Sequence, residues 1–69
     1  MTLEELRKQY ERFSEMSEKR GQMYCDNAED ANQKGNYESA SLYYYMASAA
    51  YNEATIYRQF VSDLLKVTK

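Results

Sequence analysis

Acidic side chains are the most frequent candidates for chemistry in this chain, with eleven Asp and Glu residues among 69 positions. Pairs of such groups support general acid–base catalysis, and helical bundles use them with His to hold two metal ions. The sequence contains no His. Most of the acids alternate with Lys and Arg at spacings of three or four, as in Glu4 with Lys8. This arrangement indicates ion pairs on a helix surface, each contributing roughly a few tenths of a kcal/mol.

Cys25 is the only cysteine and has no His with which to form a nucleophilic dyad. One Cys forms no disulfide within its own chain and is too few for a zinc site, so it suits a reducing, cytoplasmic compartment. We expect a small, buried or half-buried side chain here. The sequence also lacks a Gly-rich phosphate loop. These observations predict a protein that is not an enzyme and that binds no cofactor or metal.

A group of basic residues lies in the first third of the chain: Arg7, Lys8, Arg12, Lys19 and Arg20. Such a group is typical of a nucleic-acid-binding stripe, on which Tyr10 would stack a base. Five glutamates share the same segment, and the net charge of the chain is −2. A nucleic-acid-associated accessory bundle is therefore the alternative function, and its mark would be a steep salt dependence of binding.

Hydrophobic periodicity predicts the elements that position these residues. An apolar series at steps of three or four runs through Leu3, Leu6, Tyr10, Phe13, Ser17, Gly21, Tyr24, Ala28 and Ala31. This spacing predicts one helix over about residues 2–34. Thr2 is placed to cap its start, with Glu5 three residues later as in a capping box.

Gly35 and Asn36 predict a tight turn at residues 35–36, because Gly closes helices in the left-handed conformation and Asn caps the next one. A second helix is expected over about residues 37–66. Its first apolar stripe is Tyr37, Ala40, Tyr44, Ala47, Tyr51, Ala54, Arg58, Val61 and Leu65. Folding about the turn makes the helices antiparallel and places Gly21 opposite Tyr51. We therefore predict an all-α helical hairpin that forms a single domain over residues 1–69.

A second apolar stripe on the later helix consists of Tyr43, Met46, Ala50, Tyr57, Phe60, Leu64 and Val67. We expect it to have no partner within the chain, since each helix of a hairpin buries one face. Three explanations are open: a second copy packs there to form a four-helix bundle or larger oligomer, a different protein docks there, or these residues lie on the surface. Residues 43, 46, 50, 57, 60 and 64 are thus the candidate protein interface.

Eight tyrosines without a tryptophan give this chain an unusual aromatic composition. Tyrosine suits both a thin, partly wet helical core and a protein interface. No apolar run approaches the roughly 20 residues of a membrane span, and the first residues do not resemble a secretory signal. The favoured function is a small cytoplasmic protein–protein interaction module of adaptor, assembly or inhibitor type, whose Tyr-rich helical face binds itself or another protein.

The segment around the turn resembles a tetratricopeptide repeat. Gly35, Tyr37, Ala40, Tyr44 and Ala47 match the second half of that pattern, and the chain looks similar to microtubule-interacting-and-trafficking hairpins as well. The resemblance covers about a third of the chain. It implies a helix-turn-helix hairpin with a protein-binding role. The sequence departs from repeat proteins in its long helices, its single copy of the pattern and its lack of proline.

Overall fold

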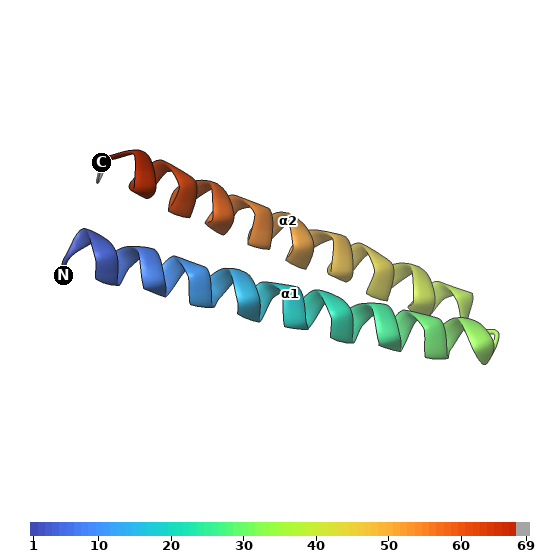
Figure 1. Ribbon diagram of the computed structural model, residues 1–69. Helices are drawn as coiled ribbons and strands as arrows, with labels where there is room; N and C mark the ends of the chain where they lie inside the picture. The colour runs from blue at the N-terminus through green and yellow to red at the C-terminus, as the bar shows by residue number, and fades with distance from the viewer. Residues whose placement is uncertain (68–69) are drawn as a thin grey trace.

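The computed structural model describes residues 1–67 and shows two long helices that lie side by side and antiparallel (Figure 1). Helix α1 spans Leu3–Gln33 and helix α2 spans Tyr37–Val67. Together they form a rod of 52 × 14 × 13 Å. The predicted all-α hairpin is therefore confirmed. The helix bounds lie within one residue of those expected from the periodicity of the sequence.

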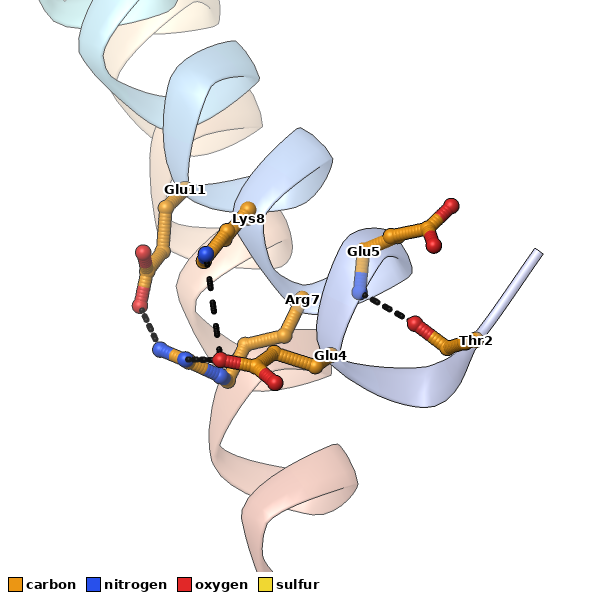
Figure 2. A network of polar contacts seen from close by, with 6 residues as sticks. All are labelled: Thr2, Glu4, Glu5, Arg7, Lys8 and Glu11. Carbon is orange, nitrogen blue, oxygen red and sulfur yellow. Dashed lines mark hydrogen bonds and ion pairs between the residues drawn. The ribbon is translucent and has the colours of Figure 1, made fainter.

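The start of α1 is fixed by its capping residue. Thr2 has an extended backbone, and its side-chain Oγ1 accepts a hydrogen bond from the backbone N–H of Glu5 at 3.1 Å (Figure 2). This bond satisfies one of the backbone donors that every helix leaves unpaired in its first turn. Glu4 and Glu5 add negative charge at the positive end of the helix dipole.

Two backbone hydrogen bonds and a glycine in the left-handed conformation stabilise the turn. Gly35 has a φ of +78° and donates to the carbonyl of Asn32 at 3.1 Å. The N–H of Asn36 reaches the carbonyl of Ala31 at 2.8 Å, which completes a Schellman motif. Asn36 then accepts the first helical bond of α2, from Ala40. Because one helix ends and the next begins within three residues, the two helices must pack directly against each other.

The buried residues between the helices are small. Among the described residues they are Ser14, Ser17, Gly21, Ala28 and Ala31 of α1, and Ala40, Ala47, Ala50 and Ala54 of α2. Small side chains let two helix backbones approach closely. At Gly21 the approach is closest, since an added Cβ would lie 2.9 Å from the ring of Tyr51. The predicted pairing of Gly21 with Tyr51 is confirmed.

Aromatic rings replace the small residues toward the termini. The ring of Tyr10 lies 6.0 Å from that of Tyr57 and 5.4 Å from that of Phe60, measured between centroids. Phe13 and Tyr57 are likewise 5.4 Å apart. Offset and tilted ring pairs at these distances are favourable contacts. Four rings from two helices therefore form one cluster in the terminal half of the rod.

The seam of α2 against α1 differs from the predicted stripe. It follows Ala40, Tyr43, Ala47, Ala50, Ala54, Tyr57, Val61 and Leu64, all buried or half-buried. The steps alternate between three and four residues, the pattern of a coiled-coil seam. The prediction that Tyr37 and Tyr44 face α1 is wrong, because both are exposed. Arg58 and Leu65 are also exposed, but they lie at the edge of the seam beside residues of α1. Every other residue of the seam comes instead from the second stripe.

The physical reason lies in three alanines of the first stripe. Ala40, Ala47 and Ala54 lie at the boundary between the two stripes. The residues between these alanines therefore determine which face of α2 packs against α1. Ala50 fits where the backbones come close, whereas the guanidinium of Arg58 would lose its hydration there. Arg58 instead forms an ion pair with Glu18 at the edge of the hairpin.

Candidate interaction surfaces

The basic residues at the start of α1 are engaged by acids on the same helix (Figure 2). Arg7 donates from Nη1 to Oε1 of Glu11 at 2.8 Å, and its Nη2 lies 3.8 Å from Oε1 of Glu4. Lys8 lies at the same distance from Glu4. A phosphate would have to compete with these carboxylates for both cations. This part of the predicted nucleic-acid stripe therefore presents little net positive charge.

Arg20 is committed to a contact between the helices. Its Nη2 donates to Oε1 of Glu53 at 2.7 Å and to the hydroxyl of Ser17 at 2.9 Å, and Ser17 donates to the same Glu53 oxygen at 2.9 Å. The Arg20 guanidinium and the Ser17 hydroxyl hold the pKa of Glu53 below its ordinary value. This three-residue network joins α1 to α2 at mid-length and neutralises both charges.

Arg12 and Lys19 are the remaining basic candidates. Within residues 1–67 neither forms an ion pair, and both are exposed. Lys19 lies beside Glu15 and Glu18 along one side of the rod. Two cations in such a mixed environment are a weak basis for electrostatic capture of nucleic acid.

Five of the six candidate interface residues contact α1, including Phe60, whose ring centroid lies 5.4 Å from that of Tyr10. Ala50 is 5% exposed in the seam. Tyr43 stacks on Tyr24 with ring centroids 6.5 Å apart, while Tyr57 contacts the aromatic cluster and Leu64 is half-buried. The expectation that this stripe has no partner within the chain is therefore wrong for these residues. That expectation assumed that α2 packs against α1 through its first stripe.

Met46 and Phe60 keep substantial exposed area, 39% and 45% respectively. On α2, three larger exposures belong to residues that lie in neither predicted stripe. Leu42 is 64%, Tyr45 76% and Ile56 55% exposed. These side chains are large and apolar, yet they extend into solvent.

These exposed residues share one side of α2. We define the α2 outer face as Leu42, Tyr45, Met46, Ala49, Ile56 and Phe60. Leu42, Ala49 and Ile56 recur every seven residues, so they line up along the helix. A signal for this face was present in the sequence, because residues 39–52 contain no charged side chain. Neither described helix has the apolar length needed to cross a membrane.

Shallow grooves run beside the α2 outer face. One is lined by Tyr45, Met46 and Ala49 together with Arg20 and Tyr24 of α1. Another lies nearer the turn, between Ser39, Leu42, Tyr43 and Met46. Both grooves include Met46, whose flexible side chain adapts to irregular partners. Side chains of another helix would fill these grooves and pack against the exposed side chains.

The opposite side of the hairpin carries Tyr51 and Cys25. Burial raises the pKa of Tyr51 above its ordinary value, with a further contribution from the nearby Cys25. Cys25 is half-buried, which agrees with a small packing residue. The part of the chain that the structure describes contains no group of three or more His, Cys, Asp or Glu side chains arranged to hold a metal ion.

Comparison of the chain with protein-family models, curated proteins and solved structures gives no match. The likeness to tetratricopeptide repeats and to microtubule-interacting-and-trafficking hairpins therefore stays an interpretation of a few residues around the turn.

Proposed function

We propose that this hairpin is a protein–protein interaction module that binds other helices through the α2 outer face. It acts by binding rather than by catalysis, and it works in the cytoplasm, where a single free cysteine is stable. The resemblance of the turn region to helical repeats agrees with such a role but carries less weight than the surface itself.

The exposure of Leu42, Tyr45 and Ile56 is the observation that supports this proposal. A helix that is apolar on two sides requires two neighbours, and α1 supplies only one of them. Isolated exposed apolar residues are common, but these three share one side of a helix with Met46 and Phe60. The surrounding run of residues 39–52 carries no charge that would keep a partner away.

Site-specific photo-crosslinking in cells tests the proposal. A photoreactive phenylalanine analogue replaces Tyr45 in one variant and Arg12 in a second, matched variant. Tyr45 is on the α2 outer face, whereas Arg12 is exposed on the charged side of α1. Both changes affect exposed positions, so both variants should retain the helical circular-dichroism spectrum of the natural chain.

Protein adducts at position 45, with few at position 12, are the expected result. The alternative function predicts the opposite pattern, in which position 12 attaches to RNA or DNA and position 45 gives no protein adduct. That pattern would overturn the proposal.

A further inference from the structure

The α2 outer face is nearly self-complementary when a second copy is laid against it in the reverse direction. Two antiparallel α2 helices, with the two-fold axis between Ala49 and Glu53, bring Leu42 of one copy opposite Phe60 of the other. The same register places Met46 opposite Ile56 and Ala49 opposite Glu53. Large apolar residues thus face each other toward both ends, and a small residue lies beside the axis, where the helices cross.

The rod shape leaves one long side large enough for such a dimer. A folded monomer of 8.2 kDa is expected to expose about 4,500 Å², whereas this rod exposes 5212 Å². The difference of about 700 Å² follows from the elongated shape of the rod. One long side of the rod measures 52 × 14 Å, which is comparable to the roughly 800 Å² that each partner contributes to a standard protein interface.

The charges select the antiparallel arrangement. In a parallel dimer every residue meets its own copy, so Asp63 would face Asp63. Such like-charge contacts cost affinity. In the antiparallel register Glu53 meets Ala49, and its charge is already neutralised by Arg20 at 2.7 Å. Asp63 meets Ser39, at the uncharged end of the helix.

We infer that the partner of the α2 outer face is a second copy of this chain, bound antiparallel through α2 in a two-fold four-helix bundle. This inference rests on the proposed function, because it names the occupant of the same surface. It adds a direction and a register, which give it tests of its own.

Disulfide trapping tests the register. In a Cys25→Ser background, Leu42→Cys and Phe60→Cys variants are purified separately, mixed and oxidised. Positions 42 and 60 lie about 27 Å apart along one helix, beyond the roughly 7 Å limit for a disulfide. The expected product is the mixed dimer. Leu42→Cys alone should form at least tenfold less dimer, since its two copies also lie about 27 Å apart.

Light scattering over a dilution series supplies the second measurement. The natural chain should have twice its monomer mass at high concentration, and Ala49→Glu should raise the dissociation constant at least tenfold. Ser48→Glu, at the adjacent exposed position, is the matched control and should change it by less than threefold. Circular dichroism of both variants confirms that their hairpins remain folded.

The outcomes separate this inference from the proposed function. A chain that stays monomeric at high concentration, or preferential Leu42→Cys self-crosslinking, overturns the antiparallel dimer. If the photoadduct at position 45 is then a different protein, the proposed function still holds. If position 45 yields no protein adduct and the chain is monomeric, both fail.

Discussion

The half of the hairpin next to the turn and the half next to the termini are held together by different contacts. Near the turn and through mid-length, Gly21, Ala47, Ala50 and their small neighbours let the backbones approach closely. Toward the termini, the rings of Tyr10, Phe13, Tyr57 and Phe60 fill the space between the helices. The first half should therefore tolerate no added volume, whereas the second should tolerate no removed volume.

The largest effect is expected at Ala54, which is completely buried at the end of the small-residue seam, just past the middle of the rod. Ala54→Leu adds three carbon atoms where the helices have no room, and we expect a loss of about 3 kcal/mol in the free energy of unfolding. Urea denaturation at one fixed protein concentration measures it. Thr55→Leu, at the exposed neighbouring position, should change stability by less than about 0.5 kcal/mol. Equal effects from both variants would show that the small-residue seam is not closely packed at Ala54.

Removal of one ring should have the next largest effect. Tyr57→Ala deletes the contacts with both Tyr10 and Phe13, and because Tyr57 is only half-buried we expect a loss of about 2 kcal/mol. Tyr57→Phe keeps the ring and should lose less than about 0.5 kcal/mol. Thermal unfolding of the three proteins checks this order. A similar loss of stability in Tyr57→Phe and Tyr57→Ala would show that the hydroxyl group, and not the ring, provides the stabilisation.

A double-mutant cycle tests whether the ring of Tyr51 restricts the space at Gly21. Gly21→Ala gains helix propensity but places a Cβ against the ring of Tyr51, so we expect a net loss of about 1 kcal/mol. In a Tyr51→Ala background the ring is absent. The same substitution should then stabilise the hairpin by about 1 kcal/mol. A change of the same sign in both backgrounds would mean that Tyr51 does not restrict this position.

The smallest effect concerns the network at mid-length, where the two halves meet. Its hydrogen bonds from Arg20 and Ser17 lower the pKa of Glu53 in the folded state. The stabilisation is therefore fully present above the ordinary pKa of a glutamate, about 4.3, and is lost as the pH falls through the lower folded value. We expect Glu53→Gln to be less stable than the natural chain at neutral pH, with the difference shrinking in acid. A difference that stays constant from neutral pH into acid would contradict this assignment.

The sequence was sufficient for the hairpin because its signals are local. Thr2, Gly35 and Asn36 act through bonds within a few residues of the chain, and the spacing of apolar residues along α1 places its inner face correctly. The pairing of Gly21 with Tyr51 followed from the turn position alone. Such features depend on sequence separation, which is visible without a structure.

The orientation of α2 was not predictable in the same way. Ala40, Ala47 and Ala54 belong to both possible inner faces, so periodicity alone leaves a choice between Ala50 and Tyr51 beside them. That choice depends on the distance between the two backbones, a tertiary quantity. The error carried over to the candidate interface, where Ala50 and Tyr57 were placed outside and Leu42, Tyr45 and Ile56 were not considered.

The tight turn at Gly35 also sets the order in which the hairpin forms. Ala31 and Ala40 are joined by only a short stretch of chain, so their contact closes a small loop, while Tyr10 and Tyr57 meet only after most of the chain is in place. Because short loops cost little entropy, the helices should zip together from the turn toward the termini, on the microsecond-to-millisecond scale of local helical proteins. Opening should run in reverse, so the backbone amides around the aromatic rings should exchange with solvent before those beside Ala31.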